Sequence, residues 1–290
     1  MKKILALDFD GVICNSIDEC LLVSYYAYTN TSDLSFDFSE INSNYKKQFR
    51  KYRYLVGPAH QFYYLWEIII NNNENIPEIF NKINSNKKLE EGFSNKFYTI
   101  RKELINDNYQ RWIRLNPFYD DLFLILKENI DLNDLYIVTS KDLISVNKLL
   151  ISNSIYIDIE HIFSRELSFS KVKLFKLLND KYQIPYNNII FVDDKISHLI
   201  EVKSLGVHCY LSMWGYIGPE SVEIANYNNI STILLSDLSD KLISKSFSTK
   251  SICFLQLSIC SKLANTLMQF SAVVFIGQIY INLLFKQLLK

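Results

Sequence analysis

The sequence of 290 residues has no excess of charge of either sign. Lys and Arg number 31, and so do Asp and Glu, which gives a formal net charge of zero and a sequence pI of about 6.9. A chain without net charge has no long-range field that would draw it to nucleic acid or to an anionic membrane surface. We therefore expect a small-molecule partner and no nucleic-acid partner.

Paired cysteines and an export signal are also absent. The five cysteines show no C-x-x-C spacing and lie among apolar neighbours, which is typical of free thiols in a reducing compartment. The apolar run at the start of the chain reaches only four residues before Asp8 ends it, too short for a signal peptide. These features predict a cytoplasmic protein.

Long hydrophobic runs are missing until residues 263–285, which carry no charge over 23 residues. This length is sufficient to cross a bilayer, but four amides interrupt the run: Asn265, Gln269, Gln278 and Asn282. Buried amides are costly in lipid and also serve helix association. Three interpretations stay open: a C-terminal membrane anchor with membrane contact, a packed or self-associating helix, and an appended, poorly folded tail.

The apolar content of 49% is ample for a folded core. Short apolar runs alternate with helical patterns after Pro117, which predicts an α/β fold with a doubly wound, Rossmann-like parallel sheet. The expected strands are Ile4–Leu7, Leu135–Val138, Ile159–Phe163, Ile189–Val192, Val207–Leu211 and Thr232–Leu235. The expected helices are Asp120–Glu128, Asp142–Ser152, Lys171–Tyr182 and Ile196–Leu205, the last closed by Gly206.

Between the first and second strands the pattern is helical throughout. Apolar residues recur at helical spacing within Ser16–Tyr28, Gln48–Ile70 and Phe93–Leu115. We therefore expect a catalytic core of residues 1–15 and 117–246, an α-helical insertion of residues 16–116, and a hydrophobic, helical C-terminal tail of residues 247–290.

Two aspartates stand directly after the first buried strand. Residues two apart in a strand face the same side, so Asp8 and Asp10 can serve one site, and Gly11 lets the chain turn away. Ligands of such sheets bind beyond the carboxyl ends of the strands. The alternative interpretation is a strand exit with solvated acids.

Three further strand ends or helix starts carry polar residues that can converge on Asp8. Thr139 and Ser140 follow the second strand and offer a hydroxyl and backbone N–H groups at a helix start, although many such residues are only N-caps. Lys171 opens a helix, where a cation opposes the helix dipole and favours a nearby anion; an ordinary surface lysine is the alternative. Asp193 and Asp194 end another buried strand.

Four carboxylates at one sheet edge repel one another. A hard divalent cation with oxygen ligands removes this repulsion, because it accepts one or two carboxylates and keeps other positions for water and phosphate. The pattern therefore indicates Mg²⁺ as the cofactor.

These four motifs, in this order, resemble those of the haloacid dehalogenase superfamily of phosphohydrolases. The likeness covers residues 1–14 and 117–240, and the helical insertion looks like the cap of that superfamily. The run from Cys209 to Tyr216 resembles a segment of phosphoglycolate-phosphatase-like members. The resemblance implies a phosphoric monoester hydrolase acting on a small phosphorylated metabolite.

The resemblance also assigns roles to the motif residues. Asp8 would be the nucleophile that forms an aspartyl-phosphate, and Asp10 the general acid and base. Thr139 would hold a phosphate oxygen, with Gly11 and Ser140 as further substrate contacts, and Lys171 would balance charge. Mg²⁺ would bind Asp8, the backbone carbonyl of Asp10, and Asp194, with Asp193 alongside.

Other expectations concern the insertion and the outer metal shell. Arg50, Lys51, Arg53 and His60 form a basic cluster around Gly57-Pro58, and Arg53 is our candidate contact to a carboxylate or second phosphate; a solvated helix face is the alternative. His198 stands where many relatives carry a further Asp, or is a helix-surface histidine. A phosphomutase, a catalytically silent binding protein and a membrane-attached assembly component are the alternative functions.

Overall fold

The computed structural model describes residues 3–31, 34–71, 74–120, 122, 124 and 134–238. The chain divides into two compact units, Met1–Ser246 and Phe247–Lys290, and all described residues belong to the first. The C-terminal tail and most of the expected helix Asp120–Glu128 lie outside the described residues. Within those described residues, no helix is both long enough and apolar enough to span a bilayer.

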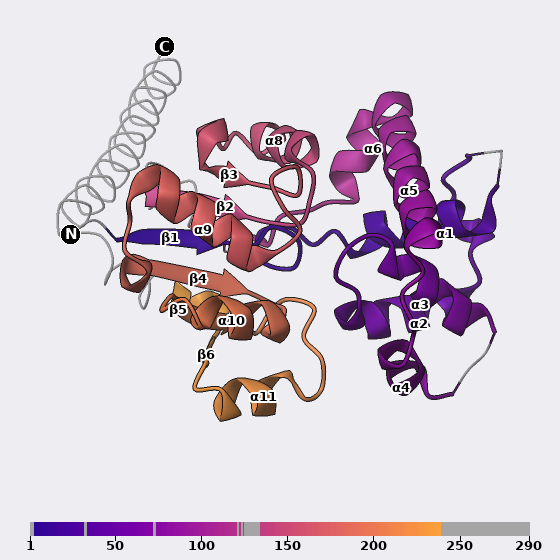
Figure 1. Ribbon diagram of the computed structural model, residues 1–290. Coiled ribbons are helices and arrows are strands. Elements are labelled where there is room, and N and C mark those ends of the chain that lie inside the picture. Colours follow the sequence, from indigo (N-terminus) through magenta and orange to yellow (C-terminus); the bar gives the residue numbers. More distant parts are fainter. Residues whose placement is uncertain are drawn as a thin grey trace, which may run out of the picture. The chain divides into compact units, whose positions relative to one another are not determined.

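The core is a six-stranded parallel sheet in the order β3-β2-β1-β4-β5-β6. Its strands are β1 (Ile4–Leu7), β2 (Leu135–Val138), β3 (Ile162–Phe163), β4 (Ile189–Asp193), β5 (His208–Ser212) and β6 (Ser231–Ile233). The chain starts in the middle with β1, builds outward through β2 and β3, then restarts at β4 on the other side (Figure 1). The predicted doubly wound sheet is confirmed, and its switch point lies between β1 and β4.

Four helices follow the strands of the core. They are α8 (Leu143–Ser152), α9 (Lys171–Tyr182), α10 (Ile196–Lys203) and α11 (Ser221–Tyr227). Apolar residues of α9 and α10, among them Phe175 and Leu199, pack on strand residues such as Ala6 and Phe191 in one buried cluster. Gly206, at φ 96°, turns the chain after α10 into β5. The same sheet face therefore carries both helices (Figure 1).

One expected strand is wrong in its first half. Residues Ile159–His161 form a 3-10 helix, and only Ile162 and Phe163 pair with β2. The carboxylate of Asp158 caps this turn by accepting a hydrogen bond from the backbone N of Glu160. Such a local side-chain bond offers the backbone an alternative to the sheet ladder.

The insertion is helical, as the periodicity predicted. Its helices are α1 (Ile17–Thr29), α2 (Ser43–Tyr52), α3 (Gln61–Ile70), α4 (Ile76–Asn81), α5 (Lys87–Asp107) and α6 (Tyr109–Arg114). The helical pattern expected over Gln48–Ile70 is interrupted by a 3-10 turn, Arg53–Leu55, and by Gly57-Pro58. Proline cannot donate a backbone hydrogen bond, so the helix cannot run through it. The insertion lies beyond the arrowheads of β1 and β4 (Figure 1).

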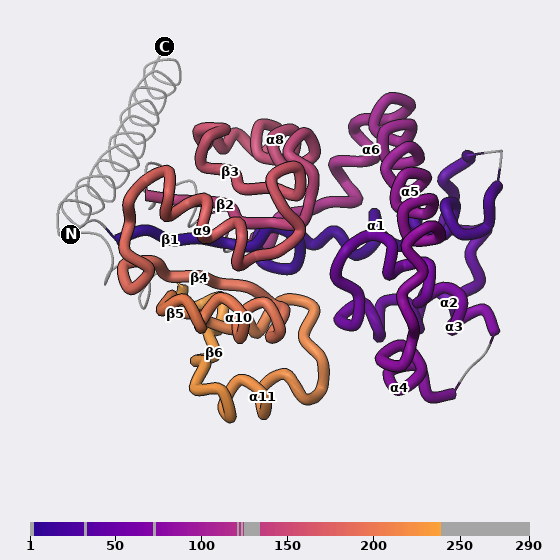
Figure 2. Tube along the Cα trace, in the orientation of Figure 1, coloured from indigo at the N-terminus to yellow at the C-terminus, as the bar shows by residue number. Residues whose placement is uncertain are grey.

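Two antiparallel connecting segments join the insertion to the sheet (Figure 2). Cys14 forms an isolated bridge with Phe118. Next to it, the backbone N of Asn15 donates to the carbonyl of Pro117 at 2.8 Å. The exit and the return of the chain are therefore held together directly beside Asp10, whose backbone also pairs with Cys14.

The three described cysteines agree with the expectation of free thiols. Cys14, Cys20 and Cys209 are unpaired and buried. Burial raises the pKa of the Cys20 thiol to about 11 and that of Cys209 to about 12. All three are therefore protonated core residues at neutral pH.

A buried ion-pair network connects the insertion with the core. Arg101 of α5 donates from Nε and Nη2 to the two carboxylate oxygens of Glu19 of α1, at 2.6 and 2.9 Å. Its Nη1 donates to Asp142, the N-cap of α8, at 3.1 Å. The side chains of Arg101 and Glu19 are 5% and 0% exposed. Removing one partner of such a pair leaves an uncompensated buried charge.

We therefore expect Arg101→Met to lower the free energy of unfolding by roughly 3–5 kcal/mol. Arg50→Met is the matched control, because Arg50 also donates two hydrogen bonds to a carboxylate, both to Oδ1 of Asp18, but with both side chains 42% exposed. The control should lose less than about 1 kcal/mol. Urea denaturation measures both losses, and equal losses would contradict this account.

Candidate active site

Polar side chains gather where the central strands end. Asp8 directly follows β1, and its backbone N donates to the carbonyl of Val192 in β4 at 3.0 Å. Asp193 is the last residue of β4, and Thr139 directly follows β2. The three residues are 7%, 0% and 1% exposed, respectively. Because parallel neighbours end at one edge of a sheet, these side chains share one buried site.

The ammonium group of Lys171 lies among three oxygen acceptors of this edge. It donates to the Asp8 carboxylate at 2.8 Å and to the backbone carbonyl of Val138 at 2.5 Å, and it lies 3.4 Å from the carboxylate of Asp193. Burial lowers the pKa of Lys171, but Asp8 and Asp193 outweigh burial and hold it above its ordinary value. Burial raises the pKa of Asp8, and the ammonium of Lys171 opposes that rise. Lys171 is therefore a buried counter-ion and no surface lysine.

Asp10 is paired with a lysine that the sequence analysis did not select. The ammonium of Lys141 lies 3.0 Å from one Asp10 carboxylate oxygen, and its side chain is fully buried. Burial raises the pKa of Asp10, but the charges of Lys141 and Arg101 outweigh burial and hold the pKa below its usual range. The hydroxyl oxygen of Thr139 accepts a hydrogen bond from the backbone N of Lys141 at 3.1 Å. Its own hydroxyl proton is then free to donate to a ligand.

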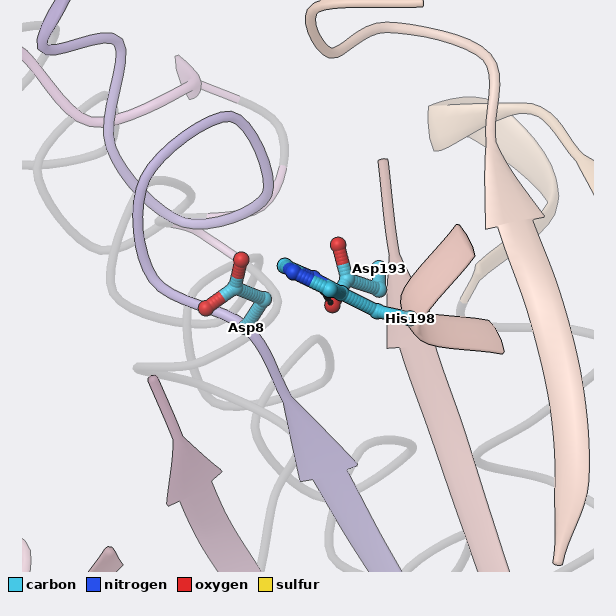
Figure 3. Close-up of side chains that lie close together, drawn as sticks. All are labelled: Asp8, Asp193 and His198. Atoms are coloured by element: carbon cyan, nitrogen blue, oxygen red, sulfur yellow. Dashed lines mark hydrogen bonds and ion pairs between the residues drawn. The ribbon is translucent and has the colours of Figure 1, made fainter. Parts of the chain in front are cut away.

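His198 reaches back from α10 to the same edge. Its Nδ1 lies 3.0 Å from the Asp193 carboxylate, and the side chain is 20% exposed. Figure 3 shows Asp8, Asp193 and His198 converging beyond the ends of β1 and β4. One ligand atom from each of these residues lies within 4.8 Å of the others, a spacing compatible with a bound cation. The helix-surface interpretation of His198 is therefore wrong, since the residue belongs to the site.

Asp194 occupies a narrow position opposite Gly11. Its carboxylate accepts a hydrogen bond from the backbone N of Tyr216 at 2.7 Å. A Cβ atom on Gly11 would stand 2.0 Å from Oδ2 of Asp194, and one on Gly215 would stand 2.3 Å from its Cβ. Burial, with the charges of Asp193 and Asp8, raises the pKa of Asp194 well above its ordinary value. The carboxylate is thus held in a place that disfavours its charge.

A cavity of about 60 Å³ lies between the strand ends and the insertion. Predicted site residues line it: Asp8, Asp10, Thr139, Ser140, Arg53 and Asp194. Of the predicted basic cluster in the insertion, only Arg53 reaches this wall. Arg50 pairs with Asp18 at the surface, and His60 lies 3.9 Å from Glu90.

Three further residues of the site were missed by sequence reasoning. Besides Lys141, they are Lys195, which lines the cavity directly after the two acids, and Tyr216, which contacts Asp194 and the guanidinium of Arg53. Burial, with the charge of Arg53, lowers the pKa of Lys195 to about 8. The only available signal was position: Lys141 and Lys195 each follow a selected motif residue directly in the sequence.

Solved structures share this fold. A hydrolase of the haloacid dehalogenase-like family from Streptococcus pneumoniae matches with a TM-score of 0.55 at 14% identity, over 80% of this chain and 93% of that one. A predicted phosphoglycolate phosphatase from Haemophilus somnus gives 0.53 at 16%, over 82% and 96%. A haloacid dehalogenase-like protein from Agrobacterium tumefaciens gives 0.55 at 12%, over 85% and 100%.

These similarities show that the chain has the fold of haloacid dehalogenase-like hydrolases, as its motifs predicted. No protein-family model matches the sequence, and no curated protein matches it. At these levels of identity the fold is shared, whereas the chemistry has to be argued from the site.

The packing of Gly11 against Asp194 leads to a stability prediction. Gly11 has φ 86° and no room for a Cβ atom, so Gly11→Ala should lower the free energy of unfolding by more than about 1 kcal/mol. Gly92 lies in the exposed interior of α5 with no atom within 4 Å of an added Cβ. Gly92→Ala should therefore raise it by about 0.5–1 kcal/mol. Chemical denaturation measures both changes, and a neutral Gly11→Ala would contradict the packing at Asp194.

Proposed function

We propose that this protein is a Mg²⁺-dependent phosphatase that hydrolyses a small phosphomonoester through an aspartyl-phosphate on Asp8. The observation that carries the proposal is the contact of Asp8 with Lys171 at the edge of the sheet. A buried carboxylate beside a buried ammonium, open to a cavity, is a typical arrangement for a nucleophile of phosphoryl transfer.

Asp8 attacks the phosphorus atom through its free carboxylate oxygen. One oxygen already accepts a hydrogen bond from Lys171, so the other is the nucleophile. A bond from this oxygen to phosphorus forms as the ester bond to the leaving alcohol breaks. The ammonium of Lys171 and the hydroxyl of Thr139 offset the negative charge of the phosphoryl oxygens in the transition state.

Asp10 moves the protons of both half-reactions. In the structure Lys141 keeps it ionised, which is the form that accepts a proton from the hydrolytic water. A phosphate dianion beside Asp10 raises its pKa, because like charges favour the neutral form. The protonated carboxyl then donates to the leaving alcohol, and the resulting carboxylate activates water for cleavage of the phosphoryl bond to Asp8.

The residues present fit a bound Mg²⁺. Asp194 is buried, repelled by Asp193 and Asp8, and has no cationic partner within hydrogen-bond distance among the described residues. The carboxylates of Asp8, Asp193 and Asp194 at this edge supply the oxygen ligands that Mg²⁺ prefers, with His198 beside them. Asp8, the carbonyl of Asp10 and Asp194 would hold the ion, which supplies charge stabilisation for the phosphoryl group. Asp193, bound by Lys171 and His198, orients the surrounding shell.

The insertion would act as the cap of this site. Arg53 and Phe62 close the cavity from the side opposite the strand ends. Closure of this kind excludes water during phosphoryl transfer and selects substrates by size.

The first test is phosphate release from p-nitrophenyl phosphate and small phosphomonoesters. We expect activity that requires Mg²⁺, is lost in EDTA, and is abolished by Asp8→Asn because the nucleophile is gone. Asp10→Asn should lower kcat by about 10²–10⁴. It should also let a phosphoryl group accumulate on the peptide that contains Asp8, detected by mass spectrometry after acid quenching.

The control for these variants is Asp18→Asn, which changes an exposed aspartate of α1. This variant should keep wild-type activity. Wild-type rates in Asp8→Asn, or an acid-quenched phosphopeptide that lacks Asp8, would refute the proposed mechanism.

Thermal denaturation tests the proposed metal site without relying on activity. Mg²⁺ should raise the Tm of the wild type, since a ligand at a hundred times its Kd stabilises by about 2.7 kcal/mol. Asp194→Asn should abolish this shift and, without Mg²⁺, should unfold at or above the wild-type Tm, because it removes a repelled buried charge. Asp180→Asn, on the exposed end of α9, is the control and should respond like the wild type. An equal Mg²⁺ shift in Asp194→Asn would contradict the assignment.

A further inference from the structure

The guanidinium group of Arg53 is a buried charge without an anionic partner. Arg53 is 7% exposed and lines the cavity. Its Nη1 donates to the backbone carbonyl of Val56 at 2.9 Å, whereas its Nε is buried with no hydrogen-bond partner. By contrast, Lys141 and Arg101, which line the same cavity, each contact a carboxylate. Within the described part of the chain, Arg53 has no such contact.

Two aromatic rings contact the guanidinium group of Arg53 but do not accept hydrogen bonds from its N–H donors. The group lies 5.1 Å from the ring centre of Phe62 in the insertion and 4.8 Å from that of Tyr216 in the core. Such cation–π contacts offset only part of the cost of burying a charged group. The rings also leave the buried Nε–H of Arg53 without an acceptor. The rings therefore orient the guanidinium group and leave the Nε–H donor for a hydrogen-bond acceptor.

Lys195 is a second cation of the same kind. It lines the cavity, and its ammonium group donates only to the backbone carbonyl of Leu55, at 3.3 Å. A Cβ atom added to Gly57 would stand 2.9 Å from Nζ of Lys195, so the ammonium packs closely against the loop that follows Arg53. Two like charges thus converge on one loop of the insertion, although they repel each other. A bound anion would remove this repulsion.

We propose that Arg53 and Lys195 form a second anion subsite, which binds a carboxylate or phosphate group on the leaving-group side of the substrate. This inference rests on the proposed function and names its substrate class: small phosphomonoesters with a second anionic group. Asp8, Lys171 and the metal site serve the transferred phosphoryl group at the strand ends, while the subsite combines Arg53 of the insertion with Lys195 of the core in the same cavity. The planar fork of arginine matches the geometry of a carboxylate or phosphate.

Binding of non-hydrolysable phosphonates tests the subsite without catalysis. Phosphonoacetate carries a carboxylate, and 2-hydroxyethylphosphonate has a hydroxymethyl group in its place. In calorimetric titrations with Mg²⁺, the wild type should bind phosphonoacetate about ten- to a hundredfold more tightly, the range of a charge-assisted hydrogen bond. Methylenebisphosphonate replaces the carboxylate by a second phosphonate. Whichever of phosphonoacetate and methylenebisphosphonate binds more tightly identifies the anionic group that the subsite takes.

Variants of Arg53 and Lys195 test whether these residues cause the preference for a second anionic group. Arg53→Met and Lys195→Met should each bring the ratio of the affinity for phosphonoacetate to that for 2-hydroxyethylphosphonate close to one, and Arg53→Lys should restore part of it. Arg50→Met, which alters an exposed arginine of the same cluster, should keep the wild-type ratio. Equal affinity of the wild type for phosphonoacetate, methylenebisphosphonate and 2-hydroxyethylphosphonate, or an unchanged ratio in Arg53→Met, would overturn the subsite.

Hydrolysis separates this inference from the proposed function. Turnover of p-nitrophenyl phosphate without any preference for 2-phosphoglycolate over 2-hydroxyethyl phosphate would reject the subsite and keep the phosphatase. Absence of all turnover, together with an Arg53-dependent preference for phosphonoacetate, would reject the phosphatase and keep the subsite.

Discussion

The contact of Lys171 with Asp8 and Asp193 is the interaction on which the rest of the site depends. Parallel strands end together, so β1 and β4 bring their terminal carboxylates to one buried edge. Without a cation there, repulsion and desolvation would disfavour the packed edge. The ammonium of Lys171 fills this position, and the backbone carbonyl of Val138 satisfies it further. In the proposed mechanism the same ammonium would offset the charge of the transferred phosphoryl group.

The insertion adds two kinds of cation to this arrangement. Arg101 is compensated by Glu19 and Asp142 and connects the insertion with the core. Arg53 has no such partner among the described residues, and it lies against the rings of Phe62 and Tyr216 at the cavity. The first kind contributes to stability, whereas the second stays available to a ligand. The presence or absence of a carboxylate partner therefore explains why Arg101 and Arg53, both in the insertion, have different expected roles.

Sequence periodicity predicted most of the elements because local forces dominate there. The bounds of β2 and α9 agree with the expected ones, since a buried apolar run and a Ser170 cap are local signals. The strand expected at Ile159 failed because the capping carboxylate of Asp158 competes with the sheet ladder. The helical pattern expected over Gln48–Ile70 did not predict the break between α2 and α3, although Pro58 in the sequence is a signal for it.

The sequence by itself determined the fold class and the residues at the strand ends, because buried strands that end in polar residues have a period and an order that can be read along one chain. Tertiary structure alone decided the pairing of those residues. That Lys141 contacts Asp10, that His198 lies near Asp8, and that Arg53 reaches the cavity depend on groups far apart in the chain. Charge compensation acts through space, so no local pattern records it.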